Sequence, residues 1–217
     1  MKESLKAALH GMRQIIGVTV ILMLVCGLVF PCLLTGLSAL IFPRQAGGNL
    51  LTIDGQTVGA EYVGQEFTED YYMWSRPSAY HYNVYLEDAD GKRYYHDGTE
   101  FPGIGSGSNN YAATNPALSQ RVEADIEAFL AKNPTVKRED IPTDLLTASG
   151  SGLDPHISPA SAEIQIPRIA EASGLTEAEI RDIVTANTQG KMLGVFGEET
   201  VNVLKVNIEI AQRMGIL

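Results

Sequence analysis

The chain has 217 residues, a formal net charge of -10 and a hydrophobic content of 45%. That apolar content argues against a disordered chain, and two cysteines are too few for a disulfide framework. A nucleic-acid partner is disfavoured, because phosphate contacts need a basic face and acidic residues outnumber basic ones by 26 to 16. The averages resemble one ordinary acidic globular domain, but neither charge nor apolarity is evenly spread.

The first feature along the chain is an uncharged apolar segment. Residues 15–42 contain no Asp, Glu, Lys, Arg, His, Asn or Gln. A helix of this length would be about 42 Å long, against roughly 30 Å of bilayer hydrocarbon. The alternative is a cleaved signal peptide, whose apolar region is about 7–15 residues long. Its nearest small-x-small cleavage pattern, Gly36-Leu37-Ser38, lies inside the run, so the segment is predicted to be an uncleaved transmembrane helix.

The charge on either side of this helix predicts its orientation. Residues 1–14 carry a net charge of +2, whereas residues 43–217 carry -12. By the positive-inside rule, residues 1–14 stay in the cytoplasm and residues 43–217 form a periplasmic or extracellular domain. Both cysteines lie within the span, so the outer domain has none and can face an oxidising compartment. The sequence thus predicts a single-pass membrane protein.

One face of the predicted span is lined with small residues. Gly27, Pro31, Thr35 and Ser38 fall at positions i, i+4, i+8 and i+11 of a helix. Small side chains let a second helix approach closely, so this stripe is a candidate contact for a partner helix. The alternative is that Gly and Pro are simply frequent in membrane helices, with Pro31 adding a kink.

The outer segment is predicted to be a single α+β domain, beginning with a hairpin and a long loop. Asp54-Gly55 separates two short apolar runs within residues 51–67, which indicates a hairpin. Residues 71–105 have no helical period and hold seven of the nine tyrosines, beside the sole tryptophan, Trp74. Such a region serves either as a contact surface for a partner or as an ordered loop that packs on itself.

Helix signals begin at Asn115-Pro116, a cap followed by proline at the first helical position. Apolar residues then recur at helical spacing until Asn133-Pro134, which should end the helix. A second helix is expected to start at Ser158-Pro159, with Pro167 kinking or splitting it before Gly174.

Two further elements close the domain. Thr176 and Glu179 have the spacing of a capping box, which predicts a third helix. Apolar residues between Val201 and Ile210 first alternate and then take a helical spacing. This pattern predicts a strand that runs into a terminal helix.

A polar loop over residues 147–159 carries side chains with chemical potential. It presents Ser149, Ser151, Asp154 and His156 just before a helix start, and a helix N-terminus can bind an anion. Three roles are open: a Ser–His–Asp hydrolase, a contact for a ligand or partner, and a set of turns and caps. Because triad members usually come from distant parts of a fold, the local clustering favours turns and caps.

Other chemical motifs are absent from the sequence. It contains no Walker loop, no Gly-x-Ser-x-Gly, no His-Glu-x-x-His and no Cys-x-x-Cys. Its four histidines are too scattered to predict a metal site, and no catalytic residue is assigned.

Short motifs along nearly the whole chain resemble those of one known family. They are the N-terminal anchor, Gly64-Gln65, Trp74-Ser75-Arg76-Pro77-Ser78-Ala79, Gly107-Ser108-Asn109, Thr114-Asn115-Pro116, Asp144 with the 147–159 loop, Gln165, Pro167-Arg168, Phe196-Gly197-Glu198, Val201-Asn202-Val203-Leu204 and Asn207. In this order and spacing they resemble the C subunit of the bacterial Kdp-type high-affinity potassium-transporting ATPase.

The resemblance implies a non-catalytic accessory subunit in the inner membrane of a bacterium, where it would stabilise a four-subunit pump. The implied partners are a channel-like A subunit, an ATP-hydrolysing B subunit, a small F subunit and membrane lipid. Trp74 and Arg76 of the longest motif are implied contacts for a partner. The domain is expected to cap the outer mouth of the channel-like subunit.

The family resemblance also implies a nucleotide role that conflicts with the predicted orientation. In that proposal no cofactor is bound stably, but the C subunit raises the affinity of the B subunit for ATP. The nucleotide sits in a transient complex with the B and C subunits, and a glutamine is the suspected contact. Gln65 and Gln165 are the candidate contacts. A domain outside the cell cannot reach cytoplasmic ATP, so the positive-inside rule opposes this role. The alternative function is a stand-alone, membrane-anchored periplasmic hydrolase that uses the 147–159 loop.

Overall fold

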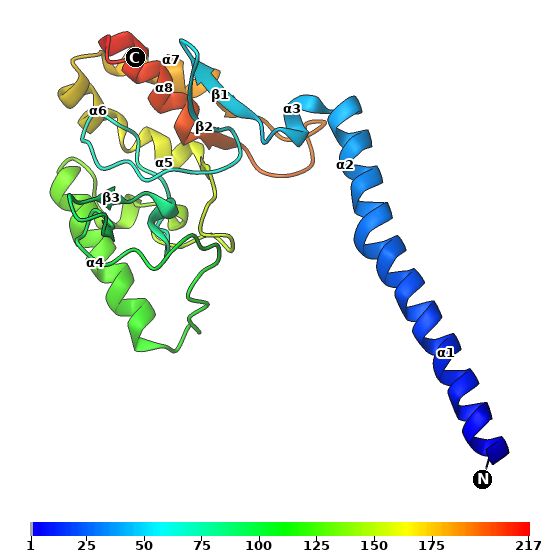
Figure 1. Ribbon diagram of the computed structural model, residues 1–217. Coiled ribbons are helices and arrows are strands. Elements are labelled where there is room, and N and C mark those ends of the chain that lie inside the picture. Colours follow the sequence, from blue (N-terminus) through cyan, green and yellow to red (C-terminus); the bar gives the residue numbers. More distant parts are fainter. Residues whose placement is uncertain (1) are drawn as a thin grey trace. The chain divides into compact units, whose positions relative to one another are not determined.

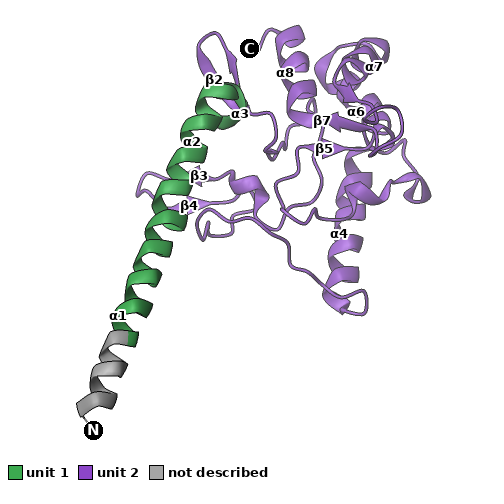
Figure 2. Cartoon of the chain, turned by 90° about the vertical axis from the view of Figure 1, so that its right-hand side faces the viewer, with its two compact units in different colours: residues 1–50 green, residues 51–217 purple. Residues whose placement is uncertain are grey.

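The computed structural model describes residues 2–217, with side chains from residue 11 onward (Figure 1). The chain forms two compact units, Met1–Leu50 and Leu51–Leu217, which are coloured separately in Figure 2. The second unit mixes helices with small antiparallel sheets, which confirms the predicted α+β class.

The first unit is a nearly continuous helix. It comprises α1 (Lys2–Leu24), a five-residue π-helix (Val25–Val29) and α2 (Phe30–Ile41), followed by the short α3 (Pro43–Ala46). Residues Gly11–Ile41 are long and apolar enough to cross a membrane, with a mean hydropathy of 2.7 in the most apolar window and none of that window buried. The helix also continues toward the N-terminus, through residues that the charge pattern assigns to the cytoplasm.

The π turn explains how the helix accommodates its proline. Pro31 has no N–H to donate to the fourth residue before it, so the regular hydrogen-bond ladder must break near that point. The N–H of Phe30 donates to the carbonyl of Val25, five residues earlier, and the extra residue is absorbed in the turn that contains Gly27. Next to Pro31, where the sequence suggested a kink, the helix therefore contains a π turn.

The second unit opens with the predicted hairpin. Strands β1 (Leu50–Ile53) and β2 (Gln56–Ala60) pair with each other. Asp54 and Gly55 between them both have positive φ, 49° and 81°, as a two-residue hairpin turn requires.

Residues 61–115 are mostly irregular and fold back on themselves. A 3-10 turn at His81–Asn83 has three consecutive positive φ angles, and β3 (Leu86–Glu87) pairs with β4 (Arg93–Tyr94). The rings of His81 and Tyr95 stack at 4.5 Å, and the Tyr95 side chain is buried. Many tyrosine side chains thus pack inside this region, which supports the alternative of an ordered loop that packs on itself.

The remaining helices begin at the caps that the sequence predicts. In α4 (Pro116–Lys132) the side chain of Asn115 accepts from the N–H of Ala117, and in α5 (Pro159–Glu163) that of Ser158 accepts from Ser161. Pro167 lies in the first turn of α6 (Ile166–Ser173), which is separate from α5, so the predicted split is confirmed. Helix α7 (Glu177–Ala186) has the predicted capping box of Thr176 with Glu179.

A three-stranded antiparallel sheet organises the C-terminal half. Its order is β5-β7-β6, formed by β5 (His156–Ile157), β7 (Thr200–Asn202) and β6 (Thr188–Gln189). Strand β7 runs directly into α8 (Val203–Met214), as predicted, and Asn202 ends the strand while its side chain caps the helix.

The core of the second unit lies where these elements meet. The fully buried side chains include Met73 from the irregular region and residues of α6, α7, β7 and α8, among them Ile166, Ile169, Ile180, Ile183, Val201, Val206 and Ile210. A segment without regular structure is therefore an integral part of the core.

Candidate functional site

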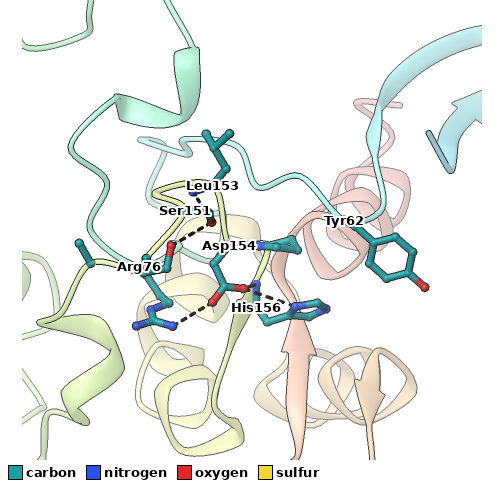
Figure 3. A pocket seen from close by; sticks show the side chains of 10 residues that line it. Tyr62, Arg76, Ser151, Leu153, Asp154 and His156 are labelled. Atoms are coloured by element: carbon teal, nitrogen blue, oxygen red, sulfur yellow. Dashed lines mark hydrogen bonds and ion pairs between the residues drawn. The ribbon is translucent and has the colours of Figure 1, made fainter. Parts of the chain in front are cut away.

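The polar 147–159 loop borders a shallow, solvent-open pocket of about 490 Å³ (Figure 3). The pocket is lined by Tyr62, Arg76, Ala148, Ser149, Gly150, Ser151, Leu153, Asp154, Pro155 and His156. All four side chains singled out in this loop are therefore brought together, with Arg76 from a distant segment.

The charged groups of the pocket form a chain centred on Asp154. Its Oδ2 lies 2.9 Å from Nη1 of Arg76, whose Nε also donates to the carbonyl of Thr147. Oδ1 of Asp154 accepts from the backbone N–H of His156 at 3.0 Å and lies 3.5 Å from Nδ1 of the same residue. Burial alone would raise the pKa of Asp154, but the hydrogen bonds from His156 and the charge of Arg76 hold it below its usual value.

The two serine hydroxyls of the loop accept hydrogen bonds from backbone N–H groups of the same turn. Oγ of Ser149 accepts from the N–H of Gly152 at 2.9 Å, and Oγ of Ser151 accepts from the N–H of Leu153 at 3.1 Å. Within residues 11–217, neither hydroxyl is hydrogen-bonded to the His156 ring. This geometry fits turns and caps, and it lacks the nucleophile–base pair that a serine hydrolase needs.

Both implied partner contacts of the longest motif are engaged inside the domain. Trp74 is partly buried, lies edge-on to Phe129, and carries the guanidinium of Arg168 at 4.0 Å from its ring centre. Arg76 is held by Asp154, as described above. The contacts that the structure gives these two side chains are therefore internal, and both side chains remain partly exposed.

The candidate glutamines differ in accessibility. Gln165 is completely buried: its Oε1 accepts from Trp74 N and Arg168 Nη2, both at 2.8 Å, and its Nε2 donates to the carbonyls of Trp74 and Ser161. Gln65 is half-buried and donates to the carbonyl of Val58 at 2.9 Å. A nucleotide could reach Gln165 only after the core opened around it.

A second, larger groove of about 750 Å³ was not foreseen from the sequence. Its lining includes residues 74–79, residues 108–111 and part of α4. Arg121 and Asp125 of α4 form an ion pair on its wall, and burial raises the pKa of Asp125 above its usual value. Its walls come from separate segments, so no local pattern could reveal it.

Tyr82, which lies near the first pocket, was also not foreseen from the sequence. The buried hydroxyl of Tyr82 lies 2.9 Å from the carbonyl of Arg76 and 3.3 Å from that of Asp154, and burial raises the pKa of this phenol. Gly64 makes room for this ring, because a Cβ there would lie 2.3 Å from Tyr82 Cε1. The Gly64-Gln65 motif was the only sequence signal for this contact. It identified the glycine that leaves room for the ring but did not identify Tyr82 itself.

Over the part of the chain that the structure describes, no group of three or more His, Cys, Asp or Glu side chains is placed to hold a metal ion.

Comparisons with known proteins agree with the motif pattern. The family model described as "KdpC: K+-transporting ATPase, c chain" matches residues 12–212. A relative named potassium-transporting ATPase KdpC subunit from Clostridium kluyveri is 54% identical over 207 residues, covering 95% of both chains. Proteins of the same name from Clostridioides difficile and Caldanaerobacter subterraneus subsp. tengcongensis are 53% and 42% identical, over 92% and 93% of this chain and 96% and 95% of theirs.

The match includes nearly all of the apolar helix and the second unit up to residue 212, so it covers both parts of the molecule rather than one shared domain. The chain therefore belongs to the KdpC family, the c chain of K+-transporting ATPases.

Proposed function

We propose that this chain is a non-catalytic, membrane-anchored accessory subunit of a potassium-transporting ATPase. The observation that carries the proposal is the near-complete match to the KdpC family, in which the aligned relatives bear the name of this pump. The apolar helix Gly11–Ile41 supplies an anchor of the right length for one membrane crossing. The partners are the channel-like A subunit, the ATP-hydrolysing B subunit, the small F subunit and membrane lipid.

The arrangement of the polar loop supports a non-catalytic role. Ser149 and Ser151 use their hydroxyls to close a turn, and Asp154 is paired with Arg76. A stand-alone hydrolase would need one of these serines next to the imidazole of His156. The loop instead presents a shaped polar surface on which another subunit can rest.

The orientation follows from charge. The +2 segment precedes the helix and the -12 domain follows it, so the domain lies outside the cytoplasm, at the cell or inner membrane of a bacterium. An acidic domain at the outer mouth of a potassium channel would raise the local cation concentration, within the roughly 8 Å over which charge acts at physiological salt. Stabilising the complex and presenting this surface together form the proposed accessory role.

Raising the ATP affinity of the B subunit is a separate candidate role, and it would require a cytoplasmic domain. The buried amide of Gln165 also counts against it, since both its oxygen and its nitrogen are already hydrogen-bonded, to Trp74, Ser161 and Arg168. Of the two candidate glutamines, Gln65 is the one with exposed surface. ATP contact is therefore expected to be transient at most, with no cofactor bound stably.

Two experiments test these statements. Complexes purified with and without this chain are compared for assembly and potassium-stimulated ATP hydrolysis, with an ATPase-dead B subunit as the background control. Normal assembly and activity without the chain would refute the accessory role. A topology reporter fused after Leu217 should signal outside the cytoplasm, and a cytoplasmic signal would overturn the orientation and revive the nucleotide role.

A further inference from the structure

The segment between β6 and β7 forms a closed turn at its end. The N–H of Met192 donates to the carbonyl of Phe196 at 2.8 Å, and the N–H of Phe196 donates back to Met192 at 3.0 Å. Leu193 and Gly194 both have positive φ, 54° and 74°. Residues 192–196, named the apolar tip below, are therefore an ordered hairpin-like turn.

The apolar tip presents its side chains to solvent. Met192, Leu193, Val195 and Phe196 are 68%, 85%, 74% and 61% exposed. No charged residue lies between Lys191 and Glu198, whose side chains approach to 3.9 Å at the base of the turn. Four adjacent exposed apolar side chains on one turn are the pattern of a contact surface, unlike a single exposed apolar residue.

The backbone of the tip adds a second observation. Leu193 is both its most exposed apolar side chain and a residue in the left-handed conformation, which non-glycine residues seldom adopt. Asn or Gly would fit this backbone better and would avoid exposing a leucine. Leucine at this position thus works against both solubility and backbone energy in the isolated chain, as expected if a partner covers it.

The chain itself brings one partner within reach. Residues 42–49 separate the end of α2 from β1, and eight residues span at most roughly 28 Å when fully extended. The segment of residues 190–199, orange in Figure 1, leaves the body of the second unit on the side where β1 begins. The edge of the domain that carries the apolar tip is therefore the edge tethered to the anchor.

We propose that the apolar tip inserts into the lipid bilayer in which the same chain is anchored. The inference rests on the membrane-anchoring part of the proposed function. Apolar side chains on an otherwise polar surface enter the headgroup and acyl boundary of a bilayer to a depth of about 5–10 Å. Lys191 and Glu198 carry charges of opposite sign that cancel at the base of the tip. Insertion therefore depends on apolar contact rather than on attraction to anionic headgroups.

Tethering makes so small a surface sufficient. Four side chains alone would hold a free domain weakly, but the anchor turns insertion into an intramolecular step at high effective concentration. The result is a second attachment point, which limits how far the domain can rotate about residues 42–49. An apolar groove on another pump subunit is the rival occupant, and it requires a surface that this chain does not supply.

The test uses the full chain, alone, in phosphatidylcholine nanodiscs. Cys26 and Cys32 are replaced by alanine, and a nitroxide label is attached at Leu193→Cys or Phe196→Cys. The matched control is Ile104→Cys, which is also an exposed apolar residue of a loop, at 88% exposure. Collisions of each label with oxygen, which concentrates in lipid, and with a water-soluble nickel complex report its surroundings.

The tip labels are expected to show a severalfold higher oxygen-to-nickel collision ratio than the Ile104→Cys label. Adding Leu193→Asn to the Phe196→Cys protein keeps the left-handed turn and should return that label toward the control value. Replacing half of the lipid by phosphatidylglycerol should change the ratio little.

Tip labels as accessible to nickel as the control would overturn the proposal. Protection that arises only after the other pump subunits are added would assign the tip to a protein groove instead. Retention of the labelled chain in the nanodiscs checks the anchor separately. Failure of the anchor would count against the proposed function, whereas a retained chain with a water-exposed tip would count only against this inference.

Discussion

The side-chain amide of Gln165 pairs with the backbone of Trp74 in both directions: it accepts from the Trp74 N–H at 2.8 Å and donates to the Trp74 carbonyl at 3.2 Å. The side-chain amide of Asn207 pairs in the same way with the backbone of Met73, the residue before Trp74. It accepts from the Met73 N–H at 2.7 Å and donates to the Met73 carbonyl at 2.9 Å. Two side-chain amides thus replace the neighbouring strand that would otherwise satisfy this buried backbone.

Gln165→Ala should lower the free energy of unfolding by about 2–4 kcal/mol, because it leaves the buried N–H of Trp74 and a donor of Arg168 without their acceptor. Urea unfolding of the detergent-solubilised chain, followed by the fluorescence of its sole tryptophan, measures the change. The matched control Gln65→Ala removes one half-buried hydrogen bond and should cost about 1 kcal/mol. Unchanged stability in Gln165→Ala would contradict the structural role and return this residue to the nucleotide hypothesis.

Arg168→Lys should destabilise the domain by roughly 2–4 kcal/mol, although it keeps the charge. The guanidinium donates to Asn133, to the carbonyls of residues 70 and 72, and to Gln165, while lying over the Trp74 ring, and an ammonium cannot reproduce this planar set. Burial lowers the pKa of Arg168 to about 10, so the group is still charged at neutral pH.

The fluorescence of Trp74 should shift in Arg168→Lys, because the stacked cation is lost, and thermal unfolding measures the stability. Arg138→Lys is the control, since Arg138 forms a solvent-exposed ion pair with Glu123 that should contribute little to stability. Equal effects of the two substitutions would show that the hydrogen bonds of the buried Arg168 guanidinium do not contribute to stability.

Asp154→Asn should destabilise the domain by about 1–2 kcal/mol at pH 7, through loss of its charge-assisted contact with Arg76. Because the folded-state pKa of Asp154 lies below the unfolded value, its contribution is complete above about pH 4. It is lost as the pH falls through the folded-state pKa.

The difference in unfolding free energy between the wild type and Asp154→Asn should therefore shrink as the pH falls from about 4 to about 2. Urea titrations at a series of pH values measure it, with Asp182→Asn, an exposed position on α7, as the control. A difference that stays constant over this range would refute the assigned pKa direction.

Gly152→Ala should destabilise the domain by more than about 2 kcal/mol. Gly152 has φ of +66°, and a Cβ there would lie 2.3 Å from the carbonyl oxygen of Gly107. Gly150→Ala is a nearby control, because nothing lies within 4 Å of its added Cβ and the change should stay within about 0.5 kcal/mol. Thermal unfolding measures both variants. Equal melting temperatures for Gly152→Ala and Gly150→Ala would show that the close approach of Gly152 to Gly107 does not constrain the fold.

Local chemistry made most of the helices predictable. The side chains of Asn115, Ser158 and Thr176 each accept a backbone hydrogen bond at the helix start inferred from the sequence. A cap or a proline acts on the turn beside it, so such signals can be read without knowing the rest of the fold. The hairpin turn at Asp54-Gly55 was predictable for the same reason.

The pockets and the buried network were not predictable in this way. Residues 71–79 have no period because their partners are distant along the chain: Gln165 precedes α6 as its N-cap, and Asn207 lies in α8. The left-handed turn at His81–Asn83 contains no glycine to mark it. The family motifs identified many of the residues concerned, but a motif states that a residue matters and not whether it contacts protein or ligand.

The amide pairing that holds Met73 and Trp74 has a consequence for how the molecule is made. Its hydrogen bonds join positions 134 and 91 residues apart, and the later partner, Asn207, lies in the last helix of the chain. As the polypeptide is synthesised from its N-terminus, this early segment stays open until α8 has been made. The last helix to be delivered therefore completes the core, and a chain cut short before Asn207 cannot close it.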